Sequence, residues 1–328
     1  MVHRLSRLGL TAILALGTAV AEPIGIPNRS TIEYPDGKKP SLKEVELGKT
    51  LFHDPRLSMN RGQSCASCHN PDLGFGDGMA KGHGTMGKSL GRNTPHLYNL
   101  AWNTIFFWDG RAATLEEQAM GPITAPGEMA LPADSLVPRL SRSSYYRKKF
   151  PEVYGKSGIS VENLAKAIAA FERTLISDNS AFDKYMKGDK TAMLPEAIRG
   201  MELFNGKAKC VLCHGGPNFT DESFHNIGIG DKDEGRNAIM KGATLVGAFK
   251  TPGLRNVTLT APYMHDGSEK TLEGVIELYN RGGNSKKNLD KLIMPLQLTG
   301  LEVQDLVAFL GALSSPVQVV APRIPSDD

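Results

Sequence analysis

The clearest hydrophobic pattern in the chain is a stripe of apolar side chains that recurs every three or four residues. Its members are Val161, Leu164, Ile168, Phe171 and Leu175. This spacing places them on one face of an α-helix, and Ser160 is of a residue type that commonly caps a helix N-terminus. The pattern therefore predicts an amphipathic helix from Ser160 to Ile176.

Two further helices are predicted nearer the C-terminus. Pro195 suits the first turn of a helix, and we expect that helix to run to Gly206. A closing helix is indicated by apolar residues at helical spacing, namely Leu306, Val307, Leu310 and Leu313. Segments that alternate apolar and polar residues are scarce. The pattern thus favours a mainly α fold class.

Residues 1–21 have the layout of a secretory signal peptide. Arg4 and Arg7 precede an apolar run over residues 8–20, and small residues at 19–21 suit a cleavage site. The run is shorter than the roughly 20 apolar residues that span a bilayer, so an uncleaved anchor is the less favoured alternative. We therefore expect export to the periplasm and no stable membrane span.

Composition narrows the function classes. The chain has 38 basic and 35 acidic residues and a formal net charge of +3, which falls to about +1 once Arg4 and Arg7 are removed. So small a charge gives no electrostatic case for a nucleic-acid partner. The 35 glycines and 20 prolines indicate long loops, and the length suits two domains of about 100–200 residues.

All four cysteines belong to two copies of one motif, Cys-x-x-Cys-His. The first copy consists of Cys65, Cys68 and His69, and the second of Cys210, Cys213 and His214. On a helical turn these three positions share a face. The thiols can therefore bond the porphyrin vinyl groups while the histidine binds iron. The motif predicts two covalently bound c-type haems, with His69 and His214 as proximal ligands.

Two other interpretations of the cysteines are weaker. A zinc site built from both pairs would need segments more than a hundred residues apart to meet, and it would leave the histidine after each pair unexplained. A thioredoxin-like redox pair is expected within a βαβ pattern, which surrounds neither motif.

The two halves of the chain are related by an internal duplication. Eight positions match at a constant offset of 157 residues: Thr94, Pro95, Asn99, Asp109, Gly110, Thr114, Leu115 and Glu116 recur as Thr251, Pro252, Asn256, Asp266, Gly267, Thr271, Leu272 and Glu273. Upstream of the motifs, Gly48 and Gly200 each begin a Gly-x-x-Leu-Phe pattern. Trp108 breaks the match, because the second half has His265 there. We predict two loop-rich, cytochrome c-like haem domains, over residues 22–180 and 181–328.

Longer strings around these positions resemble one protein family. They include Arg92-Asn93-Thr94-Pro95 and Phe107-Trp108-Asp109-Gly110-Arg111-Ala112-Ala113 in the first half, and Thr251-Pro252-Gly253-Leu254-Arg255-Asn256 and Ala261-Pro262-Tyr263-Met264-His265-Asp266-Gly267 in the second. Together they resemble the bacterial di-haem cytochrome c peroxidase and MauG superfamily, from Ser41 to Leu313. The resemblance implies an N-terminal peroxidatic haem, a C-terminal electron-transfer haem and a Ca²⁺ ion between them.

Carried over by position, the resemblance assigns Trp108 as the inter-haem tryptophan and Glu128 as the catalytic distal acid. A carboxylate over an open haem face can take a proton from one peroxide oxygen and give one to the other. The resemblance also implies calcium ligands at Asn93, Thr260 and Pro262. Without it, Trp108 would be read as a buried aromatic anchor and the others as loop and turn residues.

The sixth ligand of the C-terminal haem divides the superfamily. One branch has a methionine there, whereas Tyr279, fourteen residues after His265, places this chain nearer the MauG-like branch with an axial tyrosine. A phenolate oxygen favours ferric and higher oxidation states of iron. Met294 is the alternative ligand, and a core aromatic role is the alternative for Tyr279. His83 is either a gating ligand of the N-terminal haem or an exposed loop residue.

The function we expect is that of a periplasmic, cytochrome-c peroxidase-like oxidoreductase. It would reduce hydrogen peroxide at the N-terminal haem, while the C-terminal haem stores or relays electrons through Trp108. A small cytochrome c or a cupredoxin would donate the electrons. A homodimer is one oligomeric state left open.

Two alternatives accompany this expectation. The first is a MauG-like maturase that oxidises residues of a partner protein through a bis-ferryl-type state. The MauG that matures methylamine dehydrogenase uses a tryptophan two residues ahead of its second haem motif, where this chain has Ala208, so that particular substrate is not expected. The second is a non-enzymatic di-haem electron carrier, which has no need of an acid such as Glu128.

Overall fold

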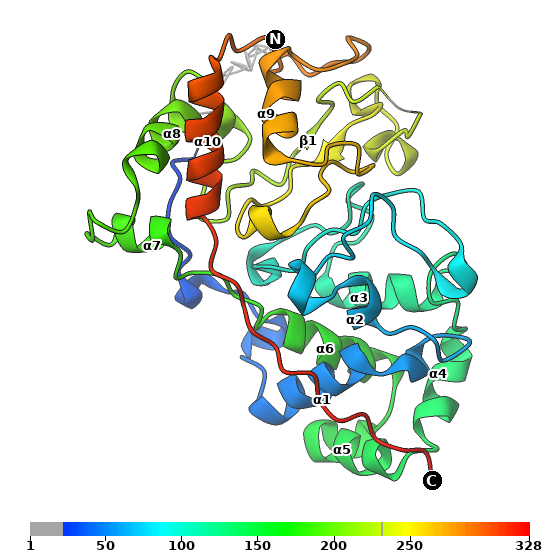
Figure 1. The fold of residues 1–328 in the computed structure, drawn as a ribbon. Coiled ribbons are helices and arrows are strands. Elements are labelled where there is room, and N and C mark those ends of the chain that lie inside the picture. The colour runs from blue at the N-terminus through cyan, green and yellow to red at the C-terminus, as the bar shows by residue number, and fades with distance from the viewer. Residues whose placement is uncertain (1–21, 231) are drawn as a thin grey trace, which may run out of the picture.

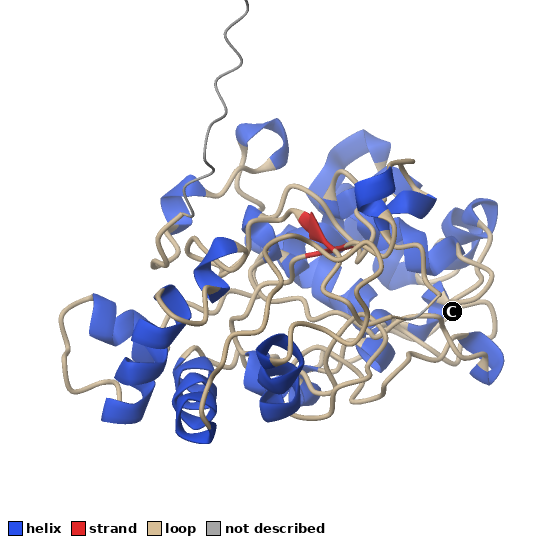
Figure 2. Cartoon of the chain, turned by 90° about the horizontal axis from the view of Figure 1, so that it is seen from above, coloured by secondary structure: helices blue, strands red, loops and turns tan. Residues whose placement is uncertain are grey.

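The computed structural model describes residues 22–230 and 232–328, so the predicted signal peptide lies outside the described residues. The chain folds into two mainly helical halves that lie against each other (Figure 1). Long loops join the helices (Figure 2). Within the described ranges, no helix has the length and apolar character needed to cross a bilayer. The mainly α fold class is confirmed.

The first half contains the helices α1 (Leu42–His53), α2 (Cys65–Cys68), α3 (Leu115–Thr124), α4 (Ala133–Leu140), α5 (Ser144–Tyr154) and α6 (Val161–Glu172). Helix α6 is the one predicted from the apolar stripe, and the Ser160 hydroxyl caps it by accepting a hydrogen bond from the Asn163 amide at 3.1 Å. It ends four residues before Ile176. The chain turns there because the Leu175 carbonyl accepts from the amide of Asn99 at 2.9 Å.

The second half contains α7 (Ala181–Met186), α8 (Pro195–Asn205), α9 (Leu272–Asn280) and α10 (Gly300–Ala312). Two short strands, β1 (Phe224–His225) and β2 (Phe249–Lys250), pair antiparallel, with Phe224 opposite Lys250 and His225 opposite Phe249. The helix expected from Pro195 is α8, and the closing helix is α10, which begins earlier than the apolar pattern indicated. Short 3₁₀ turns occur at Arg29–Thr31, Pro35–Gly37, Pro55–Leu57, Pro71–Leu73, Thr85–Gly87, Leu100–Trp102, Gly155–Ser157, Cys210–Leu212, Arg236–Ala238, Ala243–Leu245 and Val257–Leu259.

Each half is built on one close helix crossing, in which a glycine lets two backbones meet. A Cβ atom at Gly48 of α1 would lie 1.7 Å from the carbonyl oxygen of Ala167 in α6. A Cβ atom at Gly200 of α8 would lie 1.9 Å from the carbonyl oxygen of Asp305 in α10. Only glycine fits at such a distance. The Gly-x-x-Leu-Phe pattern thus marks the same packing in both halves.

Both halves also contain an asparagine in the left-handed backbone conformation at the same position of the duplication. Asn99 and Asn256 both have a φ of 59°. The side-chain oxygen of Asn99 accepts from the Ser177 amide at 2.6 Å, and that of Asn256 accepts from the Ser315 amide at 2.5 Å. Each asparagine therefore fixes the chain that leaves the last helix of its own half.

The apolar interior consists mainly of two clusters. The first gathers residues of the first half, including Leu51, Phe52 and Phe171, and the second gathers residues of the second half, including Phe204 and Phe309. The two ends of the described chain cross over. Ile24 packs against the second cluster, whereas Val317 and Val319 pack against the first.

The C-terminal segment secures this crossover. It leaves α10 and runs along the first half to the region of α5 (Figure 1). Near its end the Asp327 carboxylate accepts from Arg56 Nε and from Arg61 Nη1, each at 2.7 Å. Arg56 is itself buried and paired with the fully buried Asp54. The segment is therefore held by apolar contacts and by charge pairs.

Candidate haem sites

The two Cys-x-x-Cys-His motifs have nearly the same backbone geometry. In each, the histidine amide donates to the carbonyl of the first cysteine at 2.8 Å: His69 to Cys65, and His214 to Cys210. The first motif forms the short helix α2, whereas the second is a 3₁₀ turn over Cys210–Leu212. Both turns bring the two thiols and the imidazole to one side, as haem attachment requires.

The proximal histidines are oriented by backbone carbonyls. His69 Nδ1 lies 3.0 Å from the Phe75 carbonyl oxygen, and His214 Nδ1 lies 2.8 Å from that of Phe219. Because a carbonyl only accepts, Nδ1 carries the proton and Nε2 is left to bind a metal. Burial also lowers the pKa of both imidazoles, which favours the neutral form that ligates iron. Both histidines fit a haem.

The thiols of the two motifs are unpaired. Burial raises the pKa of Cys210 to about 12. For Cys68, burial together with the charges of Asp77 and Glu128 raises the pKa to about 11. Four thiols that are out of disulfides are available to form thioethers with porphyrin vinyl groups.

A large cavity in the described part of the chain joins the second motif to the junction between the halves. It is lined by Cys210, Cys213, His214, Tyr279 and Met294, and also by Trp108, Asn93, Thr260 and Pro262. Cys65, Cys68, His69 and Glu128 do not line it. The structure thus separates the predicted site residues into two groups, one for each motif, with Trp108 at the boundary.

Tyr279 lies on α9 and faces this cavity. Burial raises the pKa of its phenol, and the nearby Cys213 and Cys210 raise it further. Tyr279 is therefore close to both thiols of the second motif. Met294 also lines the cavity, but it is 44% exposed, and its sulfur lies 3.6 Å from the ammonium of Lys209. Of the two candidate sixth ligands, Tyr279 is buried beside the second motif, whereas Met294 is exposed.

Trp108 sits where the two halves exchange backbone hydrogen bonds. Its indole Nε1 donates to the Asn93 carbonyl at 2.9 Å, and its own carbonyl accepts from the Lys250 amide at 2.8 Å. The Asn93 amide in turn donates to the His265 carbonyl at 2.7 Å. The Trp108 and His265 rings lie 6.5 Å apart. These four residues occupy matched positions of the duplication, so the junction has approximate two-fold symmetry.

Glu128 follows α3 in a turn beside the first motif. Burial raises the pKa of its carboxyl, and the Arg111 guanidinium opposes the rise. The Glu128 carbonyl accepts from the Thr85 amide at 2.7 Å. A Cβ atom at Gly84 would lie 1.8 Å from the Gly127 carbonyl oxygen, so the loop that contains His83 packs directly on this turn.

The His83 side chain itself is exposed. Its carbonyl oxygen accepts from Gln63 Nε2 at 2.9 Å and lies 3.9 Å from the Cys68 sulfur. The backbone at His83 therefore covers the first motif, while the imidazole is directed to the surface.

The predicted calcium ligands Asn93, Thr260 and Pro262 all line the cavity. Asn93 is buried, and its Nδ2 donates to the Met79 carbonyl at 2.9 Å. The amide oxygen then remains as the acceptor for a cation. Neutral oxygens of this kind suit a hard cation.

The surroundings of two further groups near the sites are defined only by the fold. The first is Gln118 of α3, which lines the cavity and whose buried Oε1 has no hydrogen-bond partner among the described residues. Gln118 lies in the string Leu115-Glu116-Glu117-Gln118-Ala119, which opens α3. A polar residue within a buried helix face was the signal that could have singled it out.

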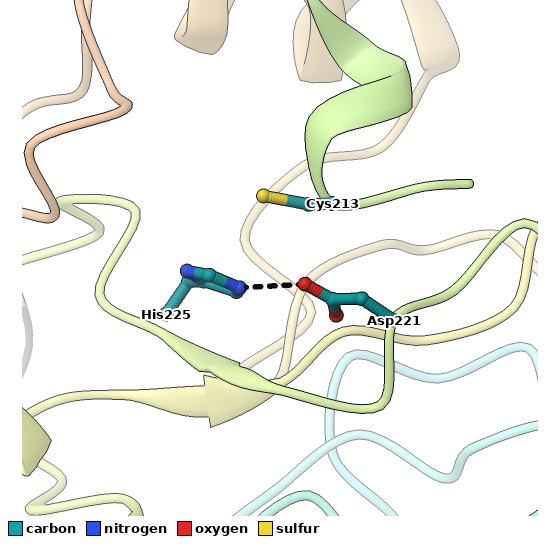
Figure 3. A group of neighbouring side chains, drawn as sticks. All are labelled: Cys213, Asp221 and His225. Carbon is teal, nitrogen blue, oxygen red and sulfur yellow. Dashed lines mark hydrogen bonds and ion pairs between the residues drawn. The ribbon is translucent and has the colours of Figure 1, made fainter. Parts of the chain in front are cut away.

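The second group is His225 with its two carboxylates. His225 Nε2 lies 3.0 Å from Asp221 Oδ2, and Nδ1 lies 2.6 Å from Asp290 Oδ2. Asp221, then Cys213, and also Asp290 raise the pKa of His225 to about 11, so the imidazole is cationic. Ligand atoms of Cys213, Asp221 and His225 lie within 4.8 Å of one another (Figure 3). Because Cys213 belongs to the haem motif, we do not interpret this group as a metal site.

Comparisons with known proteins agree with the geometry. The family described as di-haem cytochrome c peroxidase matches residues 42–191. The methylamine utilization protein MauG of Methylorubrum extorquens is 41% identical over 300 residues, covering 90% of this chain and 85% of that protein. The cytochrome-c peroxidase IdrP1 of a Pseudomonas species is 36% identical over 334 residues, covering 90% and 88%.

A solved structure is similar over the whole fold. The crystal structure of a MauG-like protein associated with microbial copper homeostasis superposes with a TM-score of 0.80 at 31% identity, covering 92% of this chain and 95% of that one. Sequence identity and coverage at this level, together with two oriented haem motifs, establish that the chain belongs to the di-haem cytochrome c peroxidase family and is an oxidoreductase with two c-type haems.

Proposed function

We propose that this protein is a periplasmic peroxidase that reduces hydrogen peroxide at the first-half haem and draws electrons through the second-half haem. Reduction of peroxide to two waters consumes two electrons and two protons. Bound haem supplies the redox-active iron. The roles of the surrounding side chains follow from where they lie.

The observation that carries the proposal is Glu128. Its carboxyl lies close enough to Cys68 to raise the pKa of that thiol, and its own pKa is raised by burial. A carboxyl with a raised pKa exchanges its proton more readily near neutral pH than an exposed acid does. We infer that Glu128 takes a proton from one peroxide oxygen and delivers it to the leaving oxygen.

Trp108 is the proposed electron relay. It lines the cavity of the second motif, and it is held by hydrogen bonds to both halves. An indole fixed in this way fills the junction and shortens the distance that an electron must cross between the sites. Because both hydrogen bonds are to backbone atoms, the ring position does not depend on a titrating side chain.

Tyr279 is the proposed sixth ligand of the second haem. Its burial beside Cys210 and Cys213 supports this role, and the exposure of Met294 argues against the alternative. A phenolate lowers the reduction potential of iron relative to a thioether. The second haem should then react in its oxidised form without prior reduction.

Two further assignments complete the proposal. Ca²⁺ is proposed at Asn93, Thr260 and Pro262, which line the same cavity as Trp108 and come from both halves, so the ion would join the two halves. Export to the periplasm is proposed from the signal-like residues 1–21. His83 stays an exposed candidate for a gating ligand of the first haem.

A MauG-like maturase is the second candidate function. It is supported by Tyr279 and by the identity to a methylamine utilization protein MauG. At the position of the substrate-facing tryptophan of that branch, this chain has Ala208, which is only 4% exposed. A non-enzymatic carrier gains no support, because Glu128 would then serve no purpose.

The test is to mix the purified di-ferric protein with hydrogen peroxide and follow the visible and near-infrared haem bands, then add a reduced small cytochrome c or cupredoxin. Rapid change followed by steady donor oxidation supports the peroxidase. A rapid change without donor turnover favours the maturase. Haem bands that do not change, even after partial reduction, would leave only the carrier.

A further inference from the structure

Arg111 is held by contacts on two sides, although its side chain is 39% exposed. Its Nη1 lies 3.0 Å from each carboxylate oxygen of Asp109. Its guanidinium carbon lies 3.5 Å from the centroid of the Phe107 ring, as in a cation–π contact. A guanidinium fixed by a carboxylate and an aromatic ring has a defined position, so its charge acts at a defined place.

Asp109 is itself fixed from the second half. It is only 4% exposed, and its Oδ2 also accepts from Arg92 Nη1 at 2.6 Å. Arg92 donates in addition to both oxygens of Asp233, at 2.7 and 2.9 Å. The Asp109 carbonyl accepts from Arg236 Nη1 at 2.9 Å. Both halves therefore hold Asp109 in place, and Asp109 holds Arg111.

Phe107 brings the guanidinium to the C-terminal part of α3. The φ of Phe107 is 69°, which is uncommon for a residue other than glycine. Its ring packs on the helix, because a Cβ atom at Gly121 would lie 3.0 Å from Phe107 Cζ. The next carbonyl of α3, that of Pro122, accepts from the Met129 amide at 3.0 Å. The turn that carries Glu128 is therefore fastened to the part of α3 that Phe107 contacts.

The charge of Arg111 acts on the Glu128 carboxyl. Burial raises the pKa of Glu128, and Arg111 opposes this rise. Other ionisable groups lie beside the turn, but the Cys68 thiol is consumed when a thioether forms. His83 and Lys88 belong to the loop that packs on the turn, and their side chains are exposed. Arg111 is therefore the cation best placed to act on Glu128.

We propose that Arg111 is a positioning residue for peroxide cleavage, which keeps the Glu128 carboxylate anionic and ready to accept a proton. The inference rests on the proposed function and adds a residue to it. The proton leaves one oxygen of hydrogen peroxide for Glu128 and then joins the other oxygen, which departs as water. The electrons are those of the proposed function. Arg111 gives up no proton, because a guanidinium stays charged in proteins.

The experiment follows the reaction of the full haem-loaded, di-ferric protein with hydrogen peroxide by stopped-flow absorbance across a range of pH. The wild-type rate should fall as the pH falls through the pKa of Glu128. In Arg111→Gln this acidic limb should move to higher pH by about one unit, because the opposing charge is gone. The rate on the limb should then be about tenfold lower, and the rate at the alkaline end should stay within about twofold of wild type.

Cyanide provides a readout that does not depend on turnover. Hydrogen cyanide gives up its proton when it binds as cyanide, so its association with the first haem needs the same base. The acidic limb of the association rate should move in Arg111→Gln as it does for peroxide. Arg111→Lys keeps the charge and should return most of the limb to its wild-type position.

Two controls separate this role from a structural one. Arg142→Gln neutralises an exposed arginine after α4 and should leave both pH profiles unchanged. In a Glu128→Gln background, which lacks the carboxylate, adding Arg111→Gln should change the rate by less than about twofold. Haem content and visible spectra should be equal in all variants.

Three results would overturn the proposal. The first is a loss of rate in Arg111→Gln by the same factor at every pH, which indicates a structural role. The second is an acidic limb that does not move, and the third is an equal loss whether residue 128 is Glu or Gln. A failure of the proposed function looks different, because Glu128→Gln would then react with peroxide as fast as wild type.

Discussion

In the first half, Trp108 stands where the second half has His265, and Asn93 stands where it has Lys250. The backbone hydrogen bonds are the same in spite of these changes. The Asn93 amide donates to the His265 carbonyl at 2.7 Å, and the Lys250 amide donates to the Trp108 carbonyl at 2.8 Å. The duplicated chain therefore supplies the same frame twice. What differs is the side chain presented at each matched position, and chemistry depends on the side chain.

The haem motifs likewise share their backbone geometry and differ in the side chains beside them. His69 and His214 are oriented by the same kind of carbonyl, yet the first motif has the Glu128 carboxyl beside it and the second has Tyr279. We propose proton transfer at the first site and ligation of iron at the second. Four predictions test whether this asymmetry lies in the side chains alone.

The largest effect is expected from Glu128→Gln. Because the amide cannot exchange a proton, peroxide turnover should fall by about 10²–10⁴-fold, while haem content and the spectrum of the second haem stay as in wild type. Glu33→Gln, at an exposed acid of the first half, is the control. Equal turnover in both variants would remove Glu128 from the mechanism.

The pH profile of the same pair of proteins adds a second readout. The pKa of Glu128 is raised above its usual 4.5, and a protonated carboxyl cannot accept a proton from peroxide. Wild-type turnover should decline as the pH falls through that raised pKa. The Glu128→Gln protein should lack this acidic limb.

Next in size are the helix crossings. Gly48→Ala and Gly200→Ala should each lower the free energy of unfolding by about 2–3 kcal/mol, because the new methyl group collides with a backbone carbonyl. Gly311→Ala in α10, where a Cβ atom meets nothing within 4 Å, should instead add up to about 1 kcal/mol. Urea unfolding measures all three. Unequal losses at Gly48 and Gly200 would show that the two halves do not share one packing scheme.

Tyr279→Phe should alter the absorption and electron paramagnetic resonance signals of one haem out of two. The first haem should keep its signal, since Tyr279 lies beside Cys210 and Cys213 only. Met294→Leu is the companion variant and should leave both signals unchanged. The reverse outcome would assign the sixth ligand to Met294.

The smallest effect is expected at His225. The carboxylates of Asp221 and Asp290 raise the pKa of His225 above 6.5 in the folded protein, so the stabilisation is complete below pH 6.5 and is lost as the pH rises through the raised pKa. Since the ring is partly solvated, we expect only about 1 kcal/mol between pH 7 and 9. Urea unfolding of His225→Gln should show a shallower decline than wild type over this range.

How far the sequence could predict these features depends on how local they are. Short stretches of sequence are enough to predict the haem motifs, the cap at Ser160 and the Gly-x-x-Leu-Phe patterns of Gly48 and Gly200. The structure contains the turns, the cap and the helix crossings that these stretches indicate. The end of α6 is different. It depends on Asn99, which lies 78 residues before Ser177 and bonds to it, so no periodic pattern near Ile176 could reveal it.

The pairing of His225 with Asp290 is likewise non-local, because it spans 65 residues and joins a strand to a loop without regular structure. Gln118 Oε1 lacks a hydrogen-bond partner among the described residues because it is buried. That burial involves several segments that are distant in the sequence. For Glu128, the sequence offered only a resemblance. The raised pKa follows from burial, which the Arg111 guanidinium only partly opposes, and both effects require the folded turn.

The crossing of the C-terminal segment bears on whether the first half can be completed by its own residues. Val317 and Val319 pack against the apolar interior of the first half, and Asp327 accepts hydrogen bonds from Arg56 and Arg61 there. A polypeptide that stops after α6 would lack these contacts, so part of the apolar interior of the first half would be left uncovered.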